Sequence, residues 1–211
     1  MSYSKPLNML QFIIIAICLG VFSSAQADSL RIVFLGDSLT AGYGLDESEA
    51  YPALVGERLK AAGITAEIVN AGISGDTSAG GARRIAWLSH QKMDILVLAL
   101  GANDALRGLE TSGTQNNLDR IIETVREAHP DVRILLAGML APPNMGSDFR
   151  QSFDAIYPEL ADRHDLVLLP FLLEGVAGNS DLNLPDGIHP NKDGQRKVAE
   201  LVYQKLRDMI E

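Results

Sequence analysis

Three side chains that can together activate a hydroxyl group lie in glycine-containing loops of the sequence. Ser38 stands in a Gly-Asp-Ser-Leu segment after an apolar run, and His189 stands in an Asp-Gly-Ile-His-Pro segment that begins at Asp186. A serine hydroxyl is a weak nucleophile until a base takes its proton. A carboxylate on one ring nitrogen of a histidine fixes the tautomer and leaves the other nitrogen free to accept that proton. These residues therefore indicate acyl transfer, with Ser38 as nucleophile, His189 as base and Asp186 as orienting acid.

Acyl transfer also needs hydrogen-bond donors for the negative charge that develops on the substrate carbonyl oxygen. The candidates are the backbone N–H of Ser38, the backbone N–H of Gly72 and the side-chain amide of Asn103, since each follows an apolar run. Gly72 has no side chain and would let the chain approach closely. Structural alternatives exist for each residue: a helix N-cap for Ser38, a turn glycine for Gly72 and a local turn hydrogen bond for Asn103.

The elements that would bring these loops together are short apolar runs separated by amphipathic segments. The runs are rich in Val, Ile and Leu and do not alternate with polar residues, which is typical of strands buried on both faces of a parallel sheet. The predicted strands are Leu30–Leu35, Ala66–Val69, Ile95–Leu100, Ile134–Ala137 and Leu166–Leu169. The predicted helices are Tyr51–Ala62, Ala79–His90, Asn116–Ala128, Phe149–Arg163 and Asp193–Ile210. This alternation predicts a doubly wound α/β domain, in which ligands bind beyond the carboxyl ends of the strands.

Length and composition indicate one domain. The chain has 211 residues, of which 46% are hydrophobic and 21% are charged, so it can bury a core of its own. A net charge of -9 with scattered basic residues argues against nucleic acid or an anionic membrane as a constant partner. The sequence has neither a His-Glu-x-x-His helix nor a phosphate-binding Gly-Lys-Ser/Thr loop, so we expect no metal and no organic cofactor.

The first 27 residues have the pattern of an export signal. Lys5 is their only charge, an apolar run follows over residues 9–22, and the segment ends in Ala-Gln-Ala at Ala27. The run is short for a bilayer span, which needs about 20 apolar residues, so cleavage after Ala27 is favoured over a retained membrane anchor. Cys18, the one cysteine, falls in this segment. The mature domain, residues 28–211, would then hold no disulfide and would be periplasmic or secreted, without stable membrane insertion.

Four spaced segments together resemble those of the SGNH (GDSL) hydrolases. They contain Ser38, Gly72, Asn103 and His189 in that order, and they span the chain from about residue 31 to the last predicted helix. The resemblance implies a flavodoxin-like three-layer α/β/α fold with a five-stranded parallel sheet. It also implies hydrolysis of acyl esters and thioesters by a serine–histidine–aspartate triad. One departure is Ala102, where the family often has a second glycine.

The resemblance further implies a mobile loop, Asp104–Leu109, that closes on an acyl chain. The acyl contacts that it suggests are Leu106, Leu109, Pro142, Pro143 and Met145, for which ordinary loop packing is the alternative. The expected partner is a small acyl ester or thioester, and we expect a monomer. Two other functions stay open. A carbohydrate O-deacetylase would use the same triad in a pocket of different shape, and a non-catalytic lipid carrier would not need the intact Ser38, Asn103 and His189.

Overall fold

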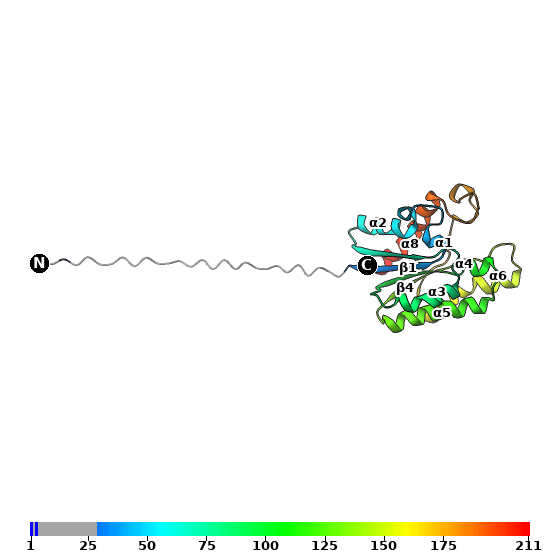
Figure 1. Cartoon of the computed structure of the whole chain (residues 1–211), viewed down its shortest axis with the longest axis horizontal. Coiled ribbons are helices and arrows are strands. Elements are labelled where there is room, and N and C mark those ends of the chain that lie inside the picture. The colour runs from blue at the N-terminus through cyan, green and yellow to red at the C-terminus, as the bar shows by residue number, and fades with distance from the viewer. Residues whose placement is uncertain (2, 4–28) are drawn as a thin grey trace.

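The five apolar runs form one parallel sheet in the computed structural model, which describes residues 1, 3 and 29–211 (Figure 1). The strands are β1 (Leu30–Gly36), β2 (Ala66–Gly72), β3 (Ile95–Ala99), β4 (Arg133–Ala137) and β5 (Val167–Leu169). Their order across the sheet is β2-β1-β3-β4-β5, and each neighbouring pair is parallel. This is the strand order of flavodoxin-like folds, so the predicted fold class is confirmed.

Helices cover both faces of the sheet (Figure 1). On one face α2 (Tyr51–Ala61) packs against α8 (Lys192–Ile210), and on the other lie α3 (Ser78–Leu88), α5 (Thr111–Ala128) and α7 (Ile156–His164). Right-handed crossovers require this division. The chain moves toward one edge of the sheet from β1 to β2 and toward the other edge from β2 to β5, so the connecting helices lie on opposite faces. The central strands carry the core: all of β3 and the last five residues of β1 are buried.

One predicted helix is divided in the structure. The segment expected to be helical over residues 149–163 forms α6 (Ser147–Asp154) and α7, which meet at Ala155. Pro158 lies in the first turn of α7 and has no N–H to donate to the carbonyl of Asp154, so an unbroken helix cannot pass through this point.

Two boundaries also differ from the prediction. β2 continues past the predicted end at Val69 and stops at Gly72, which pairs with Gly36 of β1. α5 begins at Thr111 rather than at Asn116. The other predicted strands and helices agree with the structure to within one or two residues at their ends, which is the usual uncertainty of such boundaries.

Short helices follow the two central strands directly: α1 (Ser38–Ala41) after β1 and α4 (Ala102–Leu106) after β3. Single 3₁₀ turns occur at η1 (Glu47–Glu49) and η2 (Ser180–Leu182). The predicted leader, apart from residues 1 and 3, and its cleavage site lie outside the described residues, so export stays a prediction. Within the part of the chain that is described, no helix has both the length and the apolar character to cross a bilayer.

Candidate active site

Ser38 is the first residue of α1, in a tight turn at the end of β1. Asp37 caps this helix, since its Oδ1 accepts the backbone N–H of Leu39 at 3.0 Å. The turn requires glycine at Gly36, because a Cβ there would lie 1.9 Å from Oγ1 of Thr40. Ser38 is mostly buried but borders a cavity. Its hydroxyl therefore stands where a central strand ends and a pocket begins.

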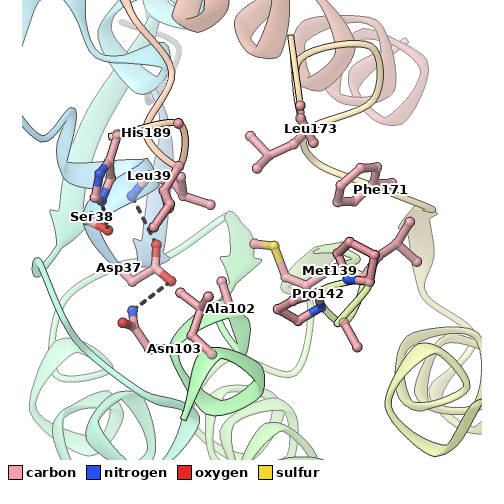
Figure 2. Close-up of a pocket in the computed structure, with 18 of the residues that line it drawn as sticks. Asp37, Ser38, Leu39, Ala102, Asn103, Met139, Pro142, Phe171, Leu173 and His189 are labelled. Atoms are coloured by element: carbon pink, nitrogen blue, oxygen red, sulfur yellow. Dashed lines mark hydrogen bonds between the residues drawn. The ribbon is translucent and has the colours of Figure 1, made fainter. Parts of the chain in front are cut away.

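His189 reaches Ser38 from a loop that precedes α8. Gly187, with φ 73°, turns the chain so that Asp186 folds back on the histidine. Asp186 Oδ1 accepts the backbone N–H groups of Ile188 (2.9 Å) and His189 (3.0 Å), and its Oδ2 lies 2.8 Å from His189 Nδ1. The other ring nitrogen, Nε2, lies 3.0 Å from Ser38 Oγ (Figure 2). The structure thus brings the three predicted residues into one chain of hydrogen bonds.

These contacts favour the ionised form of Asp186. The backbone N–H of His189, then its ring, and then the backbone N–H of Ile188 lower the pKa of Asp186 to about 2, because each hydrogen bond stabilises the carboxylate. A carboxylate at Nδ1 keeps the ring proton on that nitrogen. The Nε2 atom is then the one that faces the serine as an acceptor.

Asn103 lies on α4 and is held by two acceptors. Its Nδ2 donates to Oδ2 of Asp37 at 3.2 Å and to the main-chain carbonyl of Asp76 at 3.0 Å. Asp37 is fully buried, and burial raises its pKa to about 6, although the hydrogen bonds from Leu39 and Asn103 act in the opposite direction. The Asp37 carboxylate therefore joins the turn that carries Ser38 to the amide of Asn103 (Figure 2).

The predicted role of Gly72 as an oxyanion donor does not fit its position. Because β2 runs through Gly72, this residue belongs to the sheet and not to the loop that follows. Its N–H donates to Oδ1 of Asn70 at 3.0 Å and so already has an acceptor. Packing is what requires glycine here, since a Cβ would lie 2.3 Å from the backbone nitrogen of Ala41.

The glycine that does lie in this loop is Gly75. It is exposed, has φ 80°, and its N–H has no acceptor in the described part of the chain. The next residue, Asp76, offers its main-chain carbonyl to Asn103. The sequence prediction named Gly72 because it ended the strand at Val69, and the Ile-Ser-Gly-Asp run was the available signal for Gly75.

A largely apolar cavity of about 480 Å³ opens beside Ser38 and His189. Of the predicted acyl contacts, Leu106, Pro142 and Pro143 border it, whereas Leu109 and Met145 do not. Leu109 is exposed on the surface, and the end of the Met145 side chain lies against Gly108. Ala102, the departure from the family pattern, also borders the cavity next to Asn103 (Figure 2).

Sequence reasoning missed several residues of the site. Met139, Phe171 and Leu173 form the cavity wall opposite Ser38 and His189 (Figure 2). These three residues follow β4 and β5 in irregular segments, so no periodicity marks them, and their place beyond a strand end was the only signal. Tyr43 was also missed, and its ring packs on His189 with centroids 4.4 Å apart.

Two charged side chains of α6 border the same cavity, Arg150 and Asp154. Asp154 Oδ1 accepts the backbone N–H of Ala141 at 2.8 Å, which fixes the loop after β4 against α6. Among the residues that the structure describes, no group of three or more histidine, cysteine, aspartate or glutamate side chains could hold a metal ion.

Comparison with known proteins gives this geometry a context. The GDSL-like Lipase/Acylhydrolase family matches residues 34–197. Esterase TesA of Pseudomonas aeruginosa is 37% identical over 191 residues, which cover 90% of this chain and 94% of the relative. Thioesterase 1/protease 1/lysophospholipase L1 of Escherichia coli K12 is 40% identical over 191 residues, which cover 90% of this chain and 88% of the relative. An arylesterase of Vibrio mimicus is 35% identical over 185 residues, which cover 87% of this chain and 92% of the relative.

Solved structures agree with these sequence matches. A crystal structure of TesA matches with a TM-score of 0.80 at 38% identity, covering 85% of this chain and 99% of that chain. The structure of AlinE4, an SGNH-hydrolase family esterase, matches with a TM-score of 0.73 at 40% identity, covering 89% of this chain and 100% of that chain. The relatives are thus matched over most of their own length. The chain therefore belongs to the GDSL-like lipase/acylhydrolase family and is a hydrolase of carboxylic esters or thioesters.

Proposed function

We propose that this enzyme hydrolyses aryl and fatty acyl esters and thioesters with Ser38, His189 and Asp186 as its triad. The observation that carries the proposal is the unbroken chain of hydrogen bonds at the cavity wall. It runs over 3.0 Å from Ser38 Oγ to His189 Nε2 and over 2.8 Å from His189 Nδ1 to Asp186 Oδ2. Such contact before the substrate arrives supports a nucleophile that is already paired with its base.

The reaction proceeds in two steps. Nε2 of His189 takes the proton of Ser38 while Oγ attacks the acyl carbon, and the protonated ring then gives that proton to the leaving alcohol or thiol. Water next loses a proton to Nε2, attacks the acyl-serine, and the proton returns to Ser38 as the acid leaves. Asp186, ionised at neutral pH because its pKa is about 2, stabilises the imidazolium in both steps.

We propose three donors for the oxyanion: the N–H of Ser38, the N–H of Gly75 and the amide of Asn103. Gly75 takes the place first given to Gly72, because its N–H has no acceptor in the described residues and its loop contacts Asn103 through Asp76. Of the two hydrogen bonds that the Asn103 amide donates, the one to Asp37 is longer, at 3.2 Å. That bond is the one that a substrate oxygen would share or displace.

The cavity supports an apolar acyl group as the part of the substrate that is bound. Met139, Phe171 and Leu173 face the serine across it and offer dispersion contacts and an apolar surface. A carbohydrate deacetylase would use the same triad, but this wall gives a sugar few polar partners. A lipid carrier would need the cavity and not the hydrogen-bonded triad.

A substrate panel on the purified wild type and on Ser38→Ala tests the proposal. The panel comprises p-nitrophenyl esters of rising chain length, an acyl-CoA, a lysophospholipid and an acetylated xylo-oligosaccharide. The wild type should hydrolyse the aryl and fatty acyl substrates and spare the acetylated sugar. Ser38→Ala should lose at least about 10⁴-fold in kcat, since removing a triad nucleophile costs up to about 10⁶-fold. Preference for the acetylated sugar, or a wild-type rate in Ser38→Ala, would refute the proposal.

A further inference from the structure

An arginine outside the triad connects two of the loops that form the site. Arg84 lies on α3 with its side chain 19% exposed. Its Nε donates to Oδ2 of Asp76 at 2.8 Å, and its Nη2 donates to the main-chain carbonyl of Gly36 at 3.0 Å. One guanidinium thus holds the loop after β2 to the end of β1, directly before Asp37 and Ser38.

The two anchor points of Arg84 are next to the groups that would bind the oxyanion. The Asp76 carbonyl accepts the amide of Asn103, and Gly75 is the residue before Asp76. Gly36 also accepts the backbone N–H of Ile73 at 3.1 Å, so the start of the same loop is fixed to the same carbonyl. Displacement of the Asp76 main chain would therefore displace Gly75 and Asn103 together.

The Asp76 carboxylate is closely enclosed by α3. Its side chain is 11% exposed, and a Cβ built on Gly80 would lie 1.5 Å from its Oδ1, so the first turn of the helix leaves room only for glycine. Oδ1 accepts the backbone N–H of Thr77 at 3.1 Å, and Oδ2 binds Arg84. Without Arg84, this enclosed carboxylate would lose its cation and one of its hydrogen-bond donors.

We propose that Arg84 is a positioning residue for the oxyanion donors and acts through Asp76 and Gly36; this rests on the proposed function above. The planar guanidinium donates from Nε and Nη2 in two directions, which a lysine ammonium on a flexible stem reproduces poorly. The oxyanion forms only in the tetrahedral intermediate and the transition states that flank it, whereas the acyl group is bound in the apolar cavity in the ground state as well. Loss of the positioning should therefore lower kcat and leave KM nearly unchanged.

The experiment compares Arg84→Met with Arg83→Met, its neighbour on the same helix. Arg83 is exposed, so the two variants lose the same charge from the same element. Using one aryl ester, we expect kcat of Arg84→Met to fall by about 10- to 100-fold, below the 10²–10³-fold effect of deleting a donor outright. KM should stay within about threefold. Arg83→Met should match the wild type, and Arg84→Lys should lie between the wild type and Arg84→Met.

A second variant tests whether the effect passes through Asp76. Asp76→Asn keeps the main-chain carbonyl but weakens the bond to Arg84, so the double variant Arg84→Met/Asp76→Asn should lose less than the product of the single losses. Wild-type kcat in Arg84→Met, or a loss found only in KM, would overturn the inference. If Arg84→Met does not fold, as judged by circular dichroism, Arg84→Lys decides in the same way.

Turnover of Ser38→Ala and Arg84→Met distinguishes a wrong role for Arg84 from a wrong proposed function. If Ser38→Ala is inactive while Arg84→Met turns over like the wild type, only the inference about Arg84 is wrong. If Ser38→Ala keeps wild-type turnover, the proposed function is wrong whatever Arg84 does.

Discussion

At the scale of single residues, Asp37 serves the site at a cost to the fold. Its carboxylate is fully buried, and burial raises its pKa from 3.8 to about 6. A carboxyl group whose pKa is raised by folding contributes stability below the unfolded pKa and loses it as the pH rises through the folded pKa. Asp37 should therefore weaken the folded state progressively from about pH 4 to about pH 6, with the full penalty present at higher pH.

Replacing Asp37 by asparagine should remove this pH dependence. The rise in pKa from 3.8 to about 6 corresponds to about 3 kcal/mol at most, and the weakened contact with Asn103 reduces the gain. We expect Asp37→Asn to be more stable relative to the wild type at pH 8 than at pH 4. The free energy of unfolding of the variant minus that of the wild type, measured by urea titration, should therefore be larger at pH 8. A difference that is the same at both pH values would contradict a titrating Asp37.

Sequence reasoning found the residues whose chemistry is evident from their type. Ser38, Asn103 and His189 each lie two residues after a glycine, Ser38 and Asn103 just beyond an apolar run and His189 in a later loop. The structure places all three at one cavity. The prediction of Gly72 depended on where a strand ends, and the structure ends β2 at Gly72, whose N–H already has an acceptor, whereas Gly75 lies in the loop that follows. Tyr43 could not be predicted, since its stacking on His189 depends on the fold of two distant loops.

At the scale of elements, β2 can approach α1 closely because Gly72 has no side chain. A Cβ on Gly72 would lie 2.3 Å from the backbone nitrogen of Ala41 and 2.8 Å from the backbone carbon of Thr40. Backbone atoms cannot rotate away as a flexible side chain can. Gly72→Ala should therefore push β2 and the helix that carries Ser38 apart.

We expect Gly72→Ala to destabilise the fold by about 1–3 kcal/mol, the usual range for overpacking, and to lower the Tm by several degrees. Gly113→Ala is the control, because a Cβ at Gly113 on α5 would meet nothing within 4 Å. That variant should be neutral or slightly stabilised, since alanine favours a helix over glycine by up to about 1 kcal/mol. Equal Tm values for the two variants in thermal unfolding would contradict the packing argument.

Elements were predictable where burial alone decides them. Strands β1 and β3 are buried along almost their whole length, and an unbroken apolar run in the sequence predicts such strands directly. The boundary between α6 and α7 was missed because the hydrophobic pattern continues through Ala155, although Pro158 was a visible sign of a break. The late end of β2 depends on the pairing of Gly72 with Gly36, a contact between distant segments.

At the scale of the whole molecule, the strand order determines where the site lies. β1 and β3 are neighbours, and the chain leaves them toward opposite faces of the sheet, which is the switch point where such folds bind ligands. The last helix brings His189 to this point. Gln195 of α8 accepts the backbone N–H of Tyr51 at 2.8 Å and donates to the carbonyl of Leu39 at 3.3 Å, which ties α8 to the elements around Ser38.

The convergence of the loops was predictable from the parallel sheet, but the shape of the cavity was not. Its wall combines side chains from the ends of β4 and β5 with the loop of His189, and their mutual distances depend on packing throughout the domain. Export after cleavage behind Ala27, a mature domain over residues 28–211 and a monomeric state stay predictions from the sequence.

We propose that the hydroxyl of Ser38, the imidazole of His189 and the carboxylate of Asp186 act as one catalytic unit at this edge of the sheet. The most direct measurement is to label the active protein with a fluorophosphonate and to locate the adduct by peptide mass spectrometry. We expect one adduct per chain, on Ser38, and much slower labelling of His189→Ala. An adduct on another residue, or an active enzyme that leaves Ser38 unmodified, would contradict it.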